Sequence, residues 1–162
     1  MAGGIALSIV EDDEILYRSI SLKRNQCKRD GNGDWRLSSQ AFTDSSLKPS
    51  VDRACLFGND PTRAQKSPED GIVSLLTLDV RNIKDFKQTV NSKPMLDEHG
   101  QERMHAFDVI PDPITTHPEN PAHALITASP GYDGKSAFKR LIERLARMAG
   151  GRGWEILPQE QQ

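Results

Sequence analysis

A single amphipathic segment near the C-terminus, residues 136–149, most strongly limits how this chain can fold. Its apolar residues recur at the spacing of one face of an α-helix, and Gly150-Gly151 follows as a termination signal. A helix with one apolar face must bury that face against a second layer of structure. The apolar positions are Phe138, Leu141, Ile142, Leu145 and Met148.

The second layer is predicted to be a β-sheet, because the remaining apolar runs have the length of strands rather than of helices. These runs are rich in branched and aromatic residues and are separated by glycine, proline or charged residues. The most apolar run, Ile72–Val80, is predicted to be a central strand. The other predicted strands are residues 5–10, Ile15–Ile20, Met104–Ile110, Ala122–Ala128 and Trp154–Leu157.

Several shorter elements are predicted between these strands. Asp30–Gly33 contains the residues of a tight turn and indicates a hairpin. Pro49-Ser50 is predicted to begin a short helix that continues through Val51 to Gly58. A second short helix is predicted over Asn82–Val90, where Ile83, Phe86 and Val90 share one helical face. Residues 61–71 and 91–103 are predicted to be polar loops.

Strands and long helices do not alternate regularly along the chain, which argues against a doubly wound parallel sheet. The length of 162 residues is typical of one domain. We therefore expect a single α+β domain over residues 1–162, with a mixed or antiparallel sheet of about six strands and a C-terminal amphipathic helix. Residues 1–13 are expected to be a loosely attached N-terminal segment.

The composition argues against nucleic-acid and membrane partners. The 21 basic and 23 acidic residues give a net charge of −2, so no strong overall field attracts polyanions. No run reaches the roughly 18 apolar residues of a membrane helix, and the N-terminus lacks the basic region of a signal peptide. Cys27 and Cys55 match no metal or redox spacing. We expect a cytoplasmic protein with reduced thiols.

Arg18 lies within the predicted strand Ile15–Ile20, on the same face as Leu16 and Ile20. A charge on an apolar strand face must find a partner or a ligand. The alternative is an edge strand from which Arg18 reaches water. The sequence leaves both interpretations open.

The stretch Arg36–Ala54 carries serine, threonine, arginine and aspartate around isolated apolar residues. Polar loops on a rigid scaffold are frequent places for binding and catalysis. The Ser38 and Ser39 hydroxyls, together with the guanidinium groups of Arg18, Arg36 or Arg53, suit a phosphate or pyrophosphate. We place the candidate binding surface here.

His123 lies within a predicted strand and is the histidine favoured for proton transfer, since its pKa is ordinarily near neutrality. The alternative is a half-buried histidine that only forms hydrogen bonds. Asp108, Asp112 and His117 approach metal-ligand spacing, but prolines flank them and we assign no metal. No glycine-rich phosphate loop, HExxH motif or GxSxG motif is present.

Leu16-Tyr17-Arg18, followed by an arginine- and serine-bearing segment, resembles the NAD-using ADP-ribosyltransferase superfamily, including RES-domain NAD-degrading toxins. The run Ser50–Ala54 resembles a type VI secretion effector with that fold. The resemblance implies a bacterial toxin with NAD as its substrate. It implies that Arg18 holds the dinucleotide and that Ser38 and Ser39 form the supporting serine segment. No residue of this chain is assigned to the acidic position at the ribose.

The first functional hypothesis is therefore a small NAD-handling domain that cleaves NAD or transfers ADP-ribose. Its catalytic residues would be Arg18, Ser38, Ser39 and His123, and its substrate-binding residues Arg36, Asp52 and Arg53.

Two other functions remain open. One is a non-enzymatic interaction module for a partner or immunity-like protein. The other is an RNA-binding or RNA-cleaving protein that uses the basic face of the C-terminal helix, with His105 or His123 as a general base. That face is interpreted either as solvated or as a polyanion patch. It carries Lys139, Arg140, Arg144 and Arg147.

Overall fold

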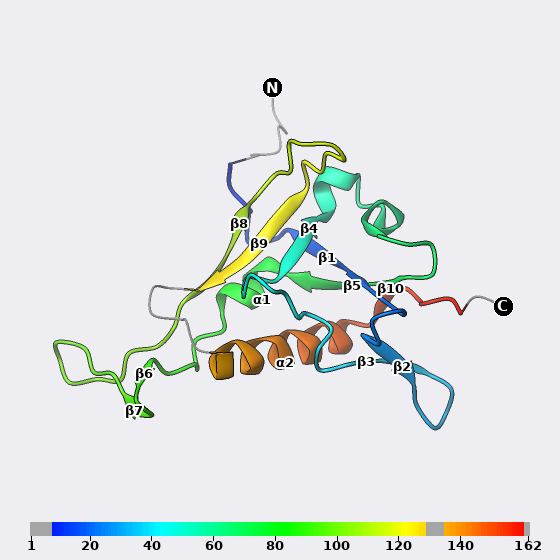
Figure 1. The fold of residues 1–162 in the computed structure, drawn as a ribbon. Coiled ribbons are helices and arrows are strands. Elements are labelled where there is room, and N and C mark those ends of the chain that lie inside the picture. Colours follow the sequence, from blue (N-terminus) through cyan, green and yellow to red (C-terminus); the bar gives the residue numbers. More distant parts are fainter. Residues whose placement is uncertain (1–7, 129–134, 161–162) are drawn as a thin grey trace.

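The structure, a computed structural model, describes residues 8–128 and 135–160. They form an α+β domain in which helix α2 (Lys135–Arg152) packs along one face of a six-stranded antiparallel sheet (Figure 1). The predicted fold class is confirmed. Across the sheet the strands follow the order β10 (Trp154–Ile156), β5 (Gly71–Leu76), β1 (Ile15–Ile20), β4 (Ser50–Arg53), β9 (His123–Ala128) and β8 (Phe107–Pro111).

Strand β1 has the predicted boundaries and lies in the interior of the sheet, between β5 and β4. Leu16 and Ile20 are fully buried on its α2 side. The alternative of an edge strand with Arg18 in water is therefore wrong.

The predicted hairpin is also confirmed. β2 (Cys27–Arg29) pairs with β3 (Trp35–Leu37) around a turn in which Gly33 has a φ of +82°. The Asp30 carboxylate accepts hydrogen bonds from the backbone of Asn32 and Asp34. This short-range polar chemistry is what the sequence motif encodes.

The helix predicted from Pro49-Ser50 to Gly58 is wrong in its first half. Ser50–Arg53 forms strand β4, and only Ala54–Phe57 (η1) is helical, as one turn of 3₁₀-helix that ends at Gly58 with a φ of +64°. β4 pairs with β1 on one side and β9 on the other. Pairing to two neighbours satisfies the backbone of a four-residue segment better than one isolated helical turn would.

The strand predicted over Ile72–Val80 ends early, at Leu76, and continues as helix α1 (Thr77–Arg81). The Thr77 backbone N–H and hydroxyl both donate to the Glu14 carbonyl, at 3.0 and 2.9 Å, and thereby fix the change of direction. Val80 is fully buried from the helix. The apolar residue at position 80 therefore belongs to the buried face of a helix rather than to a longer strand.

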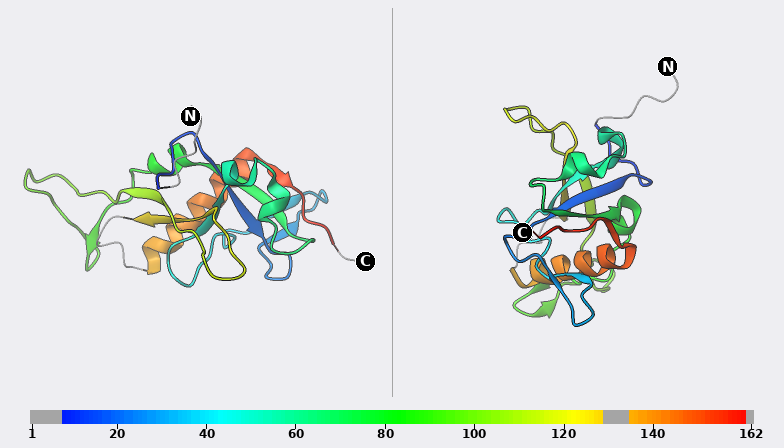
Figure 2. Two further views of the ribbon diagram at one scale, coloured as in Figure 1. Left: turned by 90° about the horizontal axis from the view of Figure 1, so that it is seen from above. Right: turned by 90° about the vertical axis from the view of Figure 1, so that its right-hand side faces the viewer.

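The helix predicted over Asn82–Val90 is wrong. Ile83 and Phe86 are buried as that pattern indicated, but residues 83–86 form no regular element, and Val90 is 54% exposed. Residues 87–104 form an arm that projects from the body of the protein, and Phe86 and His105 are buried at its base (Figure 2). The arm contains β6 (Thr89–Val90) and β7 (Lys93–Pro94), and Lys87 pairs with Met104.

Because Met104 belongs to the arm, β8 begins at Phe107 rather than at Met104 as predicted. Strand β9 agrees with the prediction to within one residue. The predicted strand over residues 5–10 is not found in residues 8–10, and residues 5–7 lie outside the described residues.

Helix α2 buries Phe138, Leu141, Ile142 and Leu145 against the sheet, as the apolar stripe predicted. It continues past Gly150-Gly151 to Arg152 and ends at Gly153, where φ is +87°. Arg152 Nε donates to the Ser74 hydroxyl on β5 at 3.0 Å. This contact ties the last turn to the sheet and explains why the two glycines do not end the helix.

A buried ion pair joins the N-terminal segment to β4. Arg53 is 1% and Glu14 7% exposed, and Arg53 Nε and Nη2 donate to the two Glu14 carboxylate oxygens at 2.7 and 2.8 Å. Burial alone would raise the pKa of Glu14. The hydrogen bonds from Arg53, the Glu11 backbone and the Cys55 thiol outweigh burial and lower that pKa below its ordinary 4.5.

We expect Glu14→Gln to lower the free energy of unfolding at pH 7 by about 3–5 kcal/mol, because it leaves the buried Arg53 charge without its counter-charge. Because the pKa of Glu14 is lowered in the folded protein, its contribution is present above pH 4.5 and is lost as the pH falls below that value. Urea denaturation at several pH values between about 3 and 7 measures the free energy of unfolding and its dependence on pH. The exposed Glu119→Gln is the control, and equal stability of the two variants would contradict this role of Glu14.

Gly71, at the start of β5, is packed too tightly for a side chain. A Cβ atom there would lie 2.5 Å from Trp154 Cζ3 and 2.9 Å from Pro158 Cδ. We expect Gly71→Ala to lower the free energy of unfolding by about 1–3 kcal/mol through overpacking. Gly31→Ala, where no atom lies within 4 Å, is the matched control in thermal denaturation. Identical melting temperatures for the two variants would refute this packing constraint.

Candidate functional site

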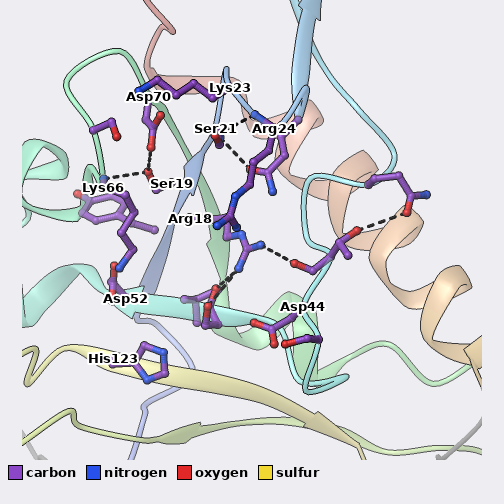
Figure 3. A pocket seen from close by; sticks show the side chains of 18 residues that line it. Arg18, Ser19, Ser21, Lys23, Arg24, Asp44, Asp52, Lys66, Asp70 and His123 are labelled. Atoms are coloured by element: carbon purple, nitrogen blue, oxygen red, sulfur yellow. Dashed lines mark hydrogen bonds between the residues drawn. The ribbon is translucent and has the colours of Figure 1, made fainter.

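The face of the sheet opposite α2 carries a polar pocket of about 910 Å³ (Figure 3). Side chains alternate along β1, so Leu16 and Ile20 face α2 while Tyr17 and Ser19 face the opposite side. Arg18 belongs by this alternation to the side of Leu16 and Ile20, but it also lines the pocket, next to the 41–50 loop. The walls of the pocket include residues from the loop before β2, the loop after β3 and the loop before β5. The other lining residues are Ser21, Lys23, Arg24, Gln26, Gln40, Thr43, Asp44, Ser45, Ser50, Val51, Asp52, Lys66, Ser67, Asp70 and His123.

Arg18 is the anchor of the pocket wall. Its Nε donates to the Ala41 carbonyl at 3.3 Å, Nη1 to the Ser50 carbonyl at 2.8 Å, and Nη2 to the Thr43 carbonyl at 3.0 Å. Burial lowers the pKa of Arg18 from its ordinary value. The expected partner of this inward-facing charge is thus a set of backbone carbonyls, and the guanidinium fastens the 41–50 loop to β1.

Asp52 places a carboxylate in the pocket floor. It is 4% exposed and lies opposite Tyr17 on β1 and His123 on β9. Its Oδ1 accepts a hydrogen bond from Asn120 Nδ2 at 2.8 Å. Among residues 8–128 and 135–160, no lysine, arginine or histidine forms a salt bridge with Asp52.

His123 lies beside Asp52 in the pocket wall, with 15% of its side chain exposed. Its Nδ1 lies 2.9 Å from the Asp112 carbonyl oxygen and 3.2 Å from the Asp112 carboxylate. The ring is therefore fixed from its β8 side.

Basic side chains line another part of the pocket. In Figure 3, Lys23 and Arg24 lie on one side of Arg18, and Asp44 and His123 lie on the other. Lys23 Nζ is 3.4 Å from the buried Glu69 carboxylate. Within the described part of the chain, the Arg24 side chain forms no salt bridge and is exposed.

The adjoining loop is organised by hydroxyl chemistry. The Ser19 hydroxyl donates to the Asp70 carboxylate at 2.9 Å and accepts from the Lys66 backbone N–H at 3.1 Å. The Lys66 side chain is exposed at the pocket, and it too has no salt bridge among the described residues. This arrangement fixes Asp70 and the backbone of Lys66 against β1.

Asp44 is a second carboxylate near Arg18. Burial alone would raise its pKa, but hydrogen bonds from Ser46 and the charge of Arg18 lower the pKa of Asp44 below its ordinary value. Asp44 is therefore ionised at neutral pH. The pocket thus holds charges of both signs.

The structure brings Arg18, Asp52 and His123 together, but not the other predicted site residues. Ser38, Ser39 and Arg36 do not line the pocket. Arg36 Nε instead pairs with Asp30 on the β2–β3 hairpin at 2.7 Å, and the Ser38 hydroxyl accepts from the Gln40 backbone.

Arg53 is directed away from the pocket and into the ion pair with Glu14. Alternation along β4 sends Asp52 to one face and Arg53 to the other. The expectation that Arg18, Arg53 and the two serines share one cleft is therefore not met. Interpreting residues 51–58 as a helix concealed this alternation.

Sequence reasoning missed Arg24, Lys66 and Asp70. Residues 61–71 were predicted to be an exposed polar loop, yet Ala64, Glu69 and Asp70 are buried and residues 61–64 form a 3₁₀ turn (η2, Pro61–Ala64). The available signal was the position of Asp70, directly before the most apolar strand. Its partner Ser19 becomes visible only once β1 and β5 are known to pair.

Neither cysteine has the properties of a catalytic nucleophile. Both are free thiols, and burial raises the pKa of Cys27. Burial and the hydrogen bond to Glu14 raise the pKa of Cys55 to about 11. The reactive thiolate form is therefore scarce at neutral pH. Among the described residues, no group of three or more histidine, cysteine or acidic side chains is arranged to hold a metal ion.

No protein-family model, curated protein or solved structure matches this chain. Within residues 8–128 and 135–160, none of the helices has the length and apolar character needed to cross a membrane. Inference about function therefore depends on the chemistry of the pocket.

We expect Arg18→Lys to loosen the pocket wall. One ammonium group cannot reproduce the fork of donors to three carbonyls, so the variant should lose about 2 kcal/mol of unfolding free energy. Amide hydrogen exchange of residues 41–50 should accelerate more than that of α2. The exposed Arg103→Lys serves as control. Unchanged exchange in the 41–50 loop would show that Arg18 does not anchor it.

Proposed function

We propose that the pocket binds a phosphate-bearing nucleotide and that NAD is this ligand. The observation that carries the proposal is the gathering of four cationic side chains in one polar pocket, together with carboxylates and hydroxyl groups. The volume of about 910 Å³ lies within the range of small-molecule sites. The cationic residues are Arg18, Lys23, Arg24 and Lys66.

Arg24 and Lys66 are the groups best suited to contact phosphate. Arg18 already donates to three backbone carbonyls, and Lys23 faces Glu69. The charges of Arg24 and Lys66 remain available to a ligand, since neither takes part in a salt bridge within the described residues. The hydroxyl groups of Ser21 and Ser67 add neutral donors in the same pocket.

The carboxylates favour NAD over a purely anionic ligand. Asp44 and Asp52 repel a ligand that carries only phosphate, but they attract a cationic group. Oxidised NAD combines an anionic pyrophosphate with a cationic nicotinamide ring. Charges of both signs in one pocket complement such a molecule better than they complement inorganic phosphate.

The expected activity is cleavage of the bond between nicotinamide and ribose, with water or an acceptor group taking the ADP-ribose. Binding that fixes the substrate, and a carboxylate near the developing positive charge of the ribose, are the means available to the pocket. Asp52 is the carboxylate that we assign to this role. It takes the acidic position that the family resemblance alone left unassigned.

We expect NAD to bind the intact chain and raise its melting temperature. Arg24→Ala and Lys66→Ala should each weaken binding by about tenfold in calorimetry, through the loss of one charged phosphate contact. Lys93→Ala, an exposed lysine on the arm, is the matched control. Absence of binding by NAD and by ADP, or equal affinity of all three variants, would contradict the proposed site.

The two alternative functions stay predictions. Exposed apolar side chains on the arm, namely those of Val90, Leu96 and Met104, favour a protein partner. For RNA, the basic face of α2 is partly neutralised, because Arg144 makes a two-bond ion pair with Asp85 at 2.6 and 3.0 Å.

A further inference from the structure

Two oxygen atoms of one residue determine where the proton of His123 lies. Nδ1 is 2.9 Å from the Asp112 carbonyl oxygen and 3.2 Å from its carboxylate. Both oxygens are acceptors, so Nδ1 must be the donor and carry the hydrogen. In the neutral ring, Nε2 then holds the lone pair.

The two residues are also joined through the backbone. The Asp112 N–H donates to the His123 carbonyl at 2.9 Å, and Pro111 pairs with Ala124 in the ladder of β8 and β9. The ring is thus held by rigid elements rather than by a free loop. Because Nδ1 is engaged by Asp112, Nε2 is the ring nitrogen left to meet a molecule in the pocket.

We propose that His123 accepts a proton at Nε2 from a molecule bound in the pocket, and that Asp112 is the positioning residue that fixes the ring for this task. The identity of the substrate rests on the proposed function, whereas the state of the ring does not. The sequence pattern grouped Asp112 with Asp108 and His117 and did not connect it with His123.

With NAD as substrate, the step balances as a hydrolysis. The C1′–N bond breaks and its electron pair stays on the nicotinamide nitrogen, which leaves as the neutral base. A water oxygen forms the new bond to C1′, and the proton of that water passes to Nε2 of His123. Asp52, opposite His123 in the strand pair, faces the positive charge that develops on the ribose.

The two oxygens of Asp112 should contribute unequally. The carbonyl is the nearer and is fixed by the backbone, whereas the carboxylate belongs to a side chain that is 53% exposed and screened by water. Asp112→Asn should therefore preserve the tautomer and lower the turnover rate only a few-fold. His123→Asn retains an amide donor toward the carbonyl but has no counterpart of Nε2. It should lower kcat about 100-fold or more, as loss of a general base does.

The first test is the tautomer of His123 in the ligand-free chain, read by long-range ¹H–¹⁵N correlation at a pH where the ring is neutral. We expect hydrogen on Nδ1 and a lone pair on Nε2. Hydrogen on Nε2 would overturn the inference. This measurement needs no substrate, so it tests the state of the ring even where NAD is not the ligand.

The second test is nicotinamide release from saturating NAD. His123→Asn should lower kcat with KM within about twofold of the wild type, since binding is assigned to other residues. His99→Asn is the matched control, because His99 is 77% exposed and lies on the arm. Unchanged kcat in His123→Asn would overturn the inference while the proposed function stands. Failure of the wild-type protein to release nicotinamide would contradict the proposed activity, and the tautomer then decides the inference alone.

Discussion

The ion pair between Glu14 and Arg53 sets the register on which the rest of the structure depends. Arg53 is almost completely buried, and the two hydrogen bonds to the Glu14 carboxylate offset the cost of burying its charge. A one-residue shift in the register of β4 would turn the Asp52 side chain into the core and the Arg53 side chain toward the pocket. The pair therefore decides which face of the sheet receives each charge of the Asp52-Arg53 sequence.

Glu14 also connects elements that are distant in the sequence. Its carbonyl receives both donors of Thr77 and so fixes the turn from β5 into α1. Its carboxylate receives the Cys55 thiol as well as Arg53. Glu14, directly before β1, thus forms hydrogen bonds with residues of β4, η1 and α1. These contacts hold the stretch before β1 in the folded domain.

The pocket follows from this arrangement together with Arg18. The alternation of side chains along β4 places Asp52 in the pocket floor. Arg18 holds the 41–50 loop against β1 by hydrogen bonds to its carbonyl groups. Because Arg18 is occupied in this way, the charges available to a ligand come from Arg24 and Lys66, outside the serine-rich stretch. The resulting mixture of cationic and acidic groups favours a ligand with both signs of charge over simple phosphate.

Local patterns were sufficient for the elements whose signal is local. The apolar stripe of α2, the branched residues of β1 and the turn residues of the β2–β3 hairpin each identified their element from neighbours in the sequence. β4 was different, because its four residues are stabilised by pairing with β1 and β9. The irregular chain at Ile83 and Phe86 likewise depends on long-range packing, which buries the same residues that a helix would.

The candidate site divides along the same line. Arg18 and His123 could be proposed because each lies in a strand with a clear pattern. Ser38 and Arg36 were misplaced because composition does not reveal which way a loop or a short hairpin strand faces. The positions of Lys66 and Asp112 relative to Ser19 and His123 could not be found without strand pairing.

The most direct test of the account is a titration of the ¹⁵N-labelled chain with NAD, followed by amide chemical shifts. The account predicts that the shifts concentrate on Ser19, Asp52, Lys66 and His123, on the face of the sheet opposite α2. Shifts confined to the basic face of α2 or to the projecting arm, or no shifts at all, would contradict it.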